Sequence, residues 1–176
     1  MIQTRRKNYV EVLVILLILV LFISSYALWG CQKKEKSLLT SVYIYGLKDA
    51  RGLSYVGGTF EYLLHENASD DLVVFYARAY SIRAEHFQDT FGLLQAYKND
   101  ERFQLMFSAM SNYNLFLHEV SIANSTRRKT LIEKNLETLK ELDNLMEEVT
   151  KYQNPDDLPP KLVKRIFQAS EELEVQ

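Results

Sequence analysis

An uninterrupted apolar run near the N-terminus constrains this chain more than any other feature. Every residue from Val12 to Ile23 is apolar, and a mostly apolar stretch continues to Trp29. At a rise of about 1.5 Å per residue, a helix over this stretch approaches the thickness of about 30 Å of the bilayer hydrocarbon core. Tyr9 and Trp29 stand at its ends, where aromatic side chains favour the membrane interface. We therefore predict a membrane segment at residues 10–30, rather than a buried core helix.

Basic residues flank this segment on both sides. On its N-terminal side they are Arg5, Arg6 and Lys7, and on its C-terminal side they are Lys33, Lys34 and Lys36. Counting the terminal amine, the positive-inside rule favours an N-terminus in the cytoplasm. The prediction is then a basic cytoplasmic N-terminus at residues 1–9, the membrane segment, and an extracytoplasmic domain at residues 31–176.

The segment has two alternative fates. It is an uncleaved signal anchor, or it is the signal of a lipoprotein. Leu28-Trp29-Gly30-Cys31 resembles the lipobox of bacterial lipoprotein signals, in which a small residue precedes the lipidated cysteine, and Cys31 is the only cysteine of the chain. The resemblance implies lipidation of Cys31, although Trp29 is larger than the residue usual at its position. Both alternatives place the domain on the same side of the membrane.

Glu11 opens the apolar run, and residues 11–16 resemble the segment that follows the processing site of type IV prepilins. The glycine that marks prepilin cleavage is absent, and the later sequence lacks a strand-rich pilin head. We prefer the interpretation that the Glu11 carboxylate lies among the lipid headgroups, where it reaches water.

Composition narrows the class of the remaining chain. Apolar residues make up 47% and charged residues 25%, which is typical of a globular domain. A net charge of −2 disfavours a nucleic-acid-binding protein, because such proteins carry a basic excess. A single cysteine excludes an internal disulfide framework.

Helical periodicity dominates after the membrane segment. The three prolines lie at 155, 159 and 160, and apolar residues recur three and four positions apart. The pattern predicts an all-α fold with helices at about 37–66, 71–97, 101–123, 127–153 and 158–173. Because the middle links are short, neighbouring helices should be antiparallel. We expect an up-and-down bundle of four long helices, closed by the short C-terminal one.

Small residues form a stripe in the first of these helices. Gly46, Ala50, Ser54 and Gly58 are four residues apart, which places them on one helix face and favours close packing of a second backbone. The alternatives are a kinked or broken helix, because each glycine lowers helix stability, and a short strand at residues 41–45.

Apolar stripes predict the core. For the helix at 71–97 the predicted core-facing residues are Leu72, Phe75, Tyr76, Ala79, Ile82, His86, Thr90, Leu93 and Tyr97. For the helix at 127–153 they are Ile132, Leu139, Leu142, Met146 and Val149, with Asn135 as a polar residue among them.

The histidines do not fit a metal centre. A ferritin-like di-iron site needs Glu and His three residues apart on two helices, whereas Glu61 and His65 are four apart and Glu85 and His86 are adjacent. HExxH, GxSxG and phosphate-binding loop motifs are also absent from the sequence. We therefore expect no cofactor, no metal and no enzymatic activity.

Three groups of residues are candidates for contact with a ligand or partner. His86 interrupts an apolar stripe, with Arg78 and Arg83 on the same helix. The basic run at residues 127–129 opens a helix, the unfavourable end for cations, and suggests an anionic lipid or acidic partner unless it is a solvated face. Tyrosines crowd the first three helices, and any in excess of the core would mark a partner surface on the helices at about 37–66 and 71–97.

Together these features predict a membrane-tethered, non-catalytic interaction or scaffold module that binds an unidentified protein or itself. The alternative is a ligand-binding domain that resembles four-helix extracytoplasmic sensors and works with a separate signalling partner.

Overall fold

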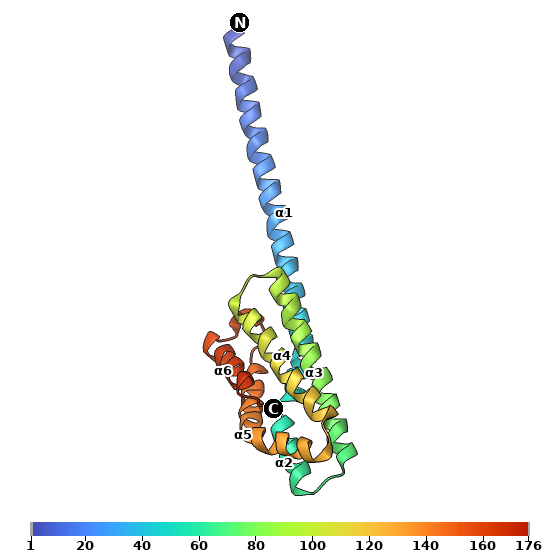
Figure 1. Cartoon of the computed structure of the whole chain (residues 1–176). Helices are drawn as coiled ribbons and strands as arrows, with labels where there is room; N and C mark the ends of the chain where they lie inside the picture. Colours follow the sequence, from blue (N-terminus) through green and yellow to red (C-terminus); the bar gives the residue numbers. More distant parts are fainter. Residues whose placement is uncertain (1, 176) are drawn as a thin grey trace. The chain divides into compact units, whose positions relative to one another are not determined.

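The computed structural model describes the backbone of residues 2–175 and the side chains of residues 15–175, and every regular element in that range is a helix (Figure 1). In chain order they are α1 (Ile2–Leu53), α2 (Val56–His65), α3 (Asp70–Tyr97), α4 (Glu101–Ile122), α5 (Ser125–Val149), the short 3-10 helix η1 (Pro155–Asp157) and α6 (Pro160–Glu171). The chain divides into two units, Met1–Leu39 and Thr40–Gln176, which we describe separately.

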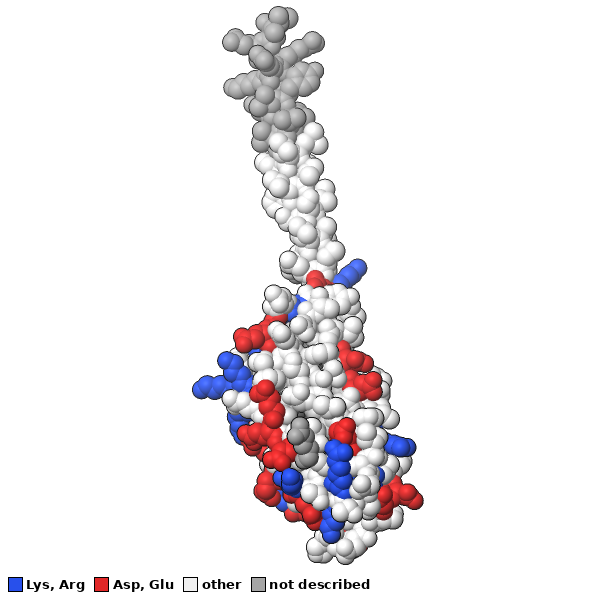
Figure 2. Space-filling view, in the orientation of Figure 1, with Lys and Arg blue, Asp and Glu red and all other residues white. Residues whose placement is uncertain are grey.

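The first unit consists of the N-terminal part of α1. Its large apolar side chains from Ile15 to Ile23 are all exposed, and Figure 2 shows no charged atoms among them. Within the described residues, this is the one helix long and apolar enough to cross a membrane. The side chains of Glu11 and of the basic cluster at residues 5–7 lie outside the described part. The predicted N-terminal helix of membrane-spanning length is confirmed.

The prediction of one helix over residues 37–66 is wrong. The helix α1 ends at Leu53, and α2 begins at Val56 after a turn. The first amides of α2 would lack acceptors at this break, and Asp143 of α5 supplies them: its two carboxylate oxygens accept from the amides of Gly57 and Gly58 at 3.0 Å each. The strand considered at residues 41–45 is helical instead.

In the second unit, α3 and α4 form a tightly packed hairpin joined at residues 98–100. The carboxylate of Asp100 caps α4 by accepting from the amide of Arg102 at 3.0 Å. Aromatic rings join the hairpin to α1: Phe91 lies 6.2 Å from Tyr43 of α1 and 6.0 Å from Phe103 of α4, measured between ring centroids.

The helix α5 packs against α2 and α6, and α6 also packs against α4. Asn124 caps α5, because its side-chain oxygen accepts from the amide of Arg127 at 3.0 Å. Pro160 is the first residue of α6, where its missing amide proton costs little. Asn135 of α5 fixes the C-terminal segment by exchanging two hydrogen bonds with the backbone of Glu174, at 2.8 and 3.0 Å.

The predicted core is confirmed in α5 and wrong in α3. All of the predicted α5 positions are buried: Ile132, Asn135, Leu139, Leu142, Met146 and Val149. In α3 the buried apolar residues are instead Val73, Ala77, Tyr80, Ala84, Phe87, Phe91 and Leu94. Of the predicted α3 stripe, only Thr90 is buried, because α3 carries apolar residues on two faces and the neighbouring helices cover the other one.

Candidate functional site

The small-residue stripe is divided by the break after α1. Gly46 packs against α3, where an added Cβ would lie 2.6 Å from the Thr90 hydroxyl oxygen. Ala50 is buried, but Ser54 lies in the turn, and a Cβ at Gly58 would meet nothing closer than 3.9 Å. The close backbone contact is made by Gly57. A Cβ added there would lie 2.6 Å from the backbone nitrogen of Lys140 in α5.

Arg128 of the basic run is a structural residue. Its side chain is buried; Nε donates to the Val120 carbonyl at 2.7 Å, and an Nη donates to the carbonyl of Ala123. These carbonyls belong to the C-terminal end of α4, where a cation is favourable. Its other Nη pairs with Asp70 at the start of α3. The expectation of a lipid or partner contact is therefore wrong for Arg128.

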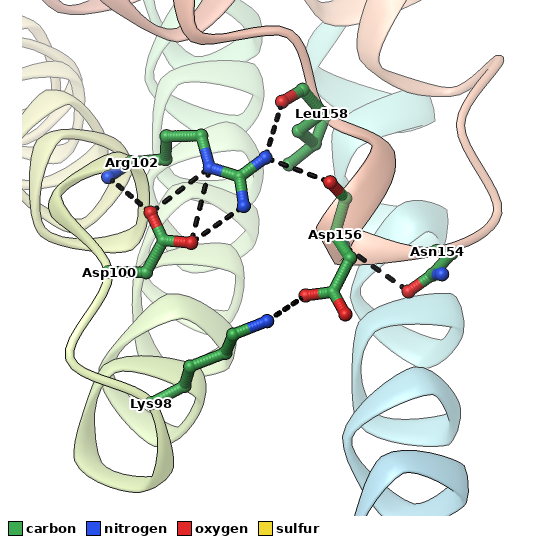
Figure 3. A network of polar contacts seen from close by, with 6 residues as sticks. All are labelled: Lys98, Asp100, Arg102, Asn154, Asp156 and Leu158. Carbon is green, nitrogen blue, oxygen red and sulfur yellow. Dashed lines mark hydrogen bonds and ion pairs between the residues drawn. The ribbon is translucent and has the colours of Figure 1, made fainter.

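A second arginine connects two loops (Figure 3). The guanidinium of Arg102 donates to both carboxylate oxygens of Asp100, and also to the carbonyls of Asp156 and Leu158, at 2.9 and 2.7 Å. Hydrogen bonds from Arg102 lower the pKa of Asp100. Lys98 pairs with the Asp156 carboxylate beside them. This network fixes the α3–α4 turn to the segment before α6, so its charges are already matched inside the domain.

Asp143 is the third internal polar contact. Burial raises the pKa of its carboxyl group, and the backbone hydrogen bonds from Val56, Gly57 and Gly58 partly offset that shift. Its contact residues lie more than eighty positions away in the sequence. Sequence reasoning missed Asp143 and Arg128 as ties between helices, because no local pattern marks such distant partners.

Two of the three predicted contact residues lie together at the junction of α1 and α3. An Nη of Arg83 is 3.5 Å from an Asp49 carboxylate oxygen of α1, and Nδ1 of His86 is 3.9 Å from the other. The His86 side chain remains 60% exposed. Arg78 is exposed on an earlier turn of α3, before Arg83, and takes part in none of the ion pairs found among the described side chains.

A groove lies beside this junction, between the outer faces of α1 and α3. It has a volume of about 520 Å³ and a mostly apolar lining. Tyr45 and Val42 of α1 form one side, and His86, Asp89 and Leu93 of α3 form the other. Tyr45 is among the most exposed tyrosines, so the tyrosine excess predicted from the sequence lies partly here.

The outer face of α3 continues this apolar surface along the helix. Its large apolar residues are all exposed, between 41% and 64%: Leu72, Phe75, Ile82, Leu93 and Tyr97. Up to Leu93, these residues together with Ala79, His86 and Asp89 follow alternating steps of three and four residues, and Tyr97 lies four residues after Leu93. That spacing is the coiled-coil pattern, which presents one helix face to a second helix. We name Leu72, Phe75, Ala79, Ile82, His86, Asp89 and Leu93 the α3 outer face.

The remaining candidates are separate from this surface. Cys31 is an exposed free cysteine in the first unit. His65 and His118 are exposed, and the described residues contain no group of three or more side chains suited to hold a metal ion.

Comparisons with known proteins give no relative for this chain: no family model, no curated protein and no solved structure matches it.

Proposed function

We propose that this chain is a membrane-tethered, non-catalytic interaction module whose binding surface is the α3 outer face. The supporting observation is the row of large apolar side chains that α3 exposes at coiled-coil spacing, although its opposite face is already buried. A contiguous exposed apolar surface is typical of sites that bind proteins. The charged networks of Arg102 and Arg128 are satisfied within the domain and leave this surface as the strongest candidate.

In this proposal residues 10–30 anchor the chain, residues 1–9 lie in the cytoplasm, and the domain lies outside it, as the positive-inside rule favours. The domain is an up-and-down bundle, in which the short links between α3, α4 and α5 reverse the chain direction. The anchor is the helix itself, or a lipid on Cys31 after cleavage.

Photo-crosslinking in native membranes tests the proposal. A photoreactive amino acid replaces Ile82 or Leu93 in the α3 outer face, and in the matched control it replaces Glu137 of α5, whose side chain is 91% exposed. We expect defined protein adducts from positions 82 and 93 and only diffuse labelling from position 137. Equal adducts at all three positions, or none at 82 and 93, would contradict the proposal.

The groove between α1 and α3 supports a second candidate, a sensory domain that binds a small ligand. Tyr45 offers an aromatic wall, and His86 and Asp89 offer polar contacts, in a volume suited to small molecules. Native mass spectrometry of the chain from its own membrane distinguishes the two. A small bound species that is lost in Tyr45→Ala favours the sensor, and co-purifying protein favours the interaction module.

A further inference from the structure

One side of α1 brings aromatic rings and lysine side chains together where the apolar segment ends. Tyr26, Trp29, Lys33 and Lys36 follow steps of three, four and three residues in an unbroken helical stretch, so they share one side of the helix. The two rings lie 6.2 Å apart between centroids, and Nζ of Lys33 lies 5.5 Å from the centroid of the Trp29 ring. We name these four residues the juxtamembrane face.

We propose that the juxtamembrane face binds the phosphate groups of anionic phospholipids. The ammonium group of Lys33 makes the charge contact, and the indole of Trp29 holds it at the level of the headgroups. This inference rests on the membrane anchor of the proposed function, in its uncleaved form, and goes beyond it because it names the lipid class that the anchor selects.

Helix geometry sets the depth of each group. Trp29 and Lys33 are separated by a rise of about 6 Å, which is close to the headgroup thickness of about 5–8 Å on each side of the hydrocarbon core. The Cα–Cβ bonds of a helix lean towards its N-terminus, so the side chain of Lys33 leans back towards the membrane segment. Aromatic side chains favour the edge of the hydrocarbon. With the Trp29 ring there, the Lys33 ammonium group lies among the phosphates.

The contact between Lys33 and Trp29 leaves room for a phosphate. A cation over an indole ring is attracted by the ring, and an ammonium group has three hydrogen-bond donors. It can therefore contact the ring and a phosphate oxygen at the same time. Trp29 is 59% exposed and Lys33 is also exposed, so lipid reaches both side chains.

The charges around the helix favour this side for an anion. Lys33 and Lys36 both present cations here, and lysines near a membrane surface attract anionic lipids. Glu35, the acidic residue of this stretch, is rotated about 200° from Lys33 and lies on the opposite side of the helix. Lys34 is rotated about 100° from Lys33 and lies outside the juxtamembrane face.

Fluorescence quenching tests the inference, because Trp29 is the only tryptophan of the chain. The full chain is reconstituted in vesicles of equal parts phosphatidylcholine and phosphatidylglycerol, with bromine in the upper acyl chains of one lipid or of the other. Bromine quenches a nearby indole, so equal quenching by the two lipids means that neither is selected. We expect brominated phosphatidylglycerol to quench Trp29 at least about twofold more than brominated phosphatidylcholine.

Two variants with the same net charge test the assignment to one side of the helix. Lys33→Gln should make the quenching by the two lipids equal, and the matched control Lys34→Gln should keep most of the difference. Equal quenching in the wild type, or an equal loss of selectivity in both variants, would overturn the inference and leave the anchor standing.

The remaining outcomes separate this inference from the proposed function. A chain that begins at Cys31 when its mass is measured from its own membrane lacks Trp29, and would overturn the inference while the interaction module keeps a lipid anchor. Trp29 emission that neither brominated lipid quenches would contradict the membrane anchor, and with it both proposals.

Discussion

The helices α5 and α3 show two ways to place apolar residues on a helix. In α5 the large apolar side chains gather on one face and, apart from the half-buried Leu136, all are buried against the rest of the domain. In α3 a buried face packs against α4 and α1, while a second apolar row stays exposed on the other side. The apolar face of α5 is covered within this domain, whereas α3 carries a second apolar surface that only a further partner would remove from water.

The largest expected difference lies between the two faces of α3 itself. Phe87 is fully buried, 5.0 Å from the Phe91 ring, so Phe87→Ala should lower the free energy of unfolding by about 3–5 kcal/mol. Phe75 is 64% exposed, and Phe75→Ala should change the free energy of unfolding by less than about 1 kcal/mol. Denaturant titration of both variants measures this, and similar losses would mean that the two faces are not distinct.

Two adjacent arginines of α5, the buried Arg128 and the exposed Arg127, should differ in their contribution to stability. Arg128→Ala should cost about 2–3 kcal/mol, because the carbonyls of Val120 and Ala123 and the carboxylate of Asp70 lose a charged donor. Arg127→Ala, at an exposed position, is the matched control and should cost less than about 1 kcal/mol. Thermal and denaturant unfolding give both values; a loss at Arg127 as large as at Arg128 would refute the structural role.

The contact of α5 with α2 predicts opposite outcomes at adjacent glycines. Gly57→Ala places a Cβ against the α5 backbone at Lys140 and Leu139 and should cost about 1–3 kcal/mol. Gly58→Ala has room for its Cβ, and alanine is the better helix former, so it should be neutral or stabilising by up to about 1 kcal/mol. The free energies of unfolding of the two variants test this prediction. An equal loss at both positions would argue against the close contact of α2 with the α5 backbone at Gly57.

The smallest expected effect is a pH dependence at the same contact. Because burial raises the pKa of Asp143, its folded state holds the proton more tightly, and the associated stability is lost as pH rises above the ordinary value of 3.8. Asp143→Asn stays neutral and lacks this dependence. The stability of the wild type relative to this variant should therefore decrease from about pH 3 to pH 7. A relative stability that rises over that range would contradict the assignment.

The contrast between the helices also explains how far the sequence predicts the fold. Leu139, Leu142 and Met146 sit on the single apolar face of α5, so periodicity identifies the core there. In α3 the row at Phe75, Ile82 and Leu93 is as periodic as the buried row, and periodicity alone does not say which one the neighbours cover.

The candidate site was predicted only in part, for a related reason. Arg83 and His86 were identified on their own helix, but their contact with Asp49 depends on how α1 packs against α3. The break after Leu53 was likewise hidden, because its cap comes from Asp143 on α5. Contacts between distant segments depend on tertiary packing, and no local pattern in a single sequence reveals which distant residues meet.

Carbene footprinting tests the central claim, that the α3 outer face is covered by a protein partner. Labelling of Phe75, Ile82 and Leu93 is compared between the chain in its native membrane and the same chain extracted and diluted in mild detergent, with exposed Ile122 of α4 as internal reference. We expect labelling of the three residues to rise several-fold on dilution, while that of Ile122 stays constant. Equal labelling of the three residues in both states would contradict it.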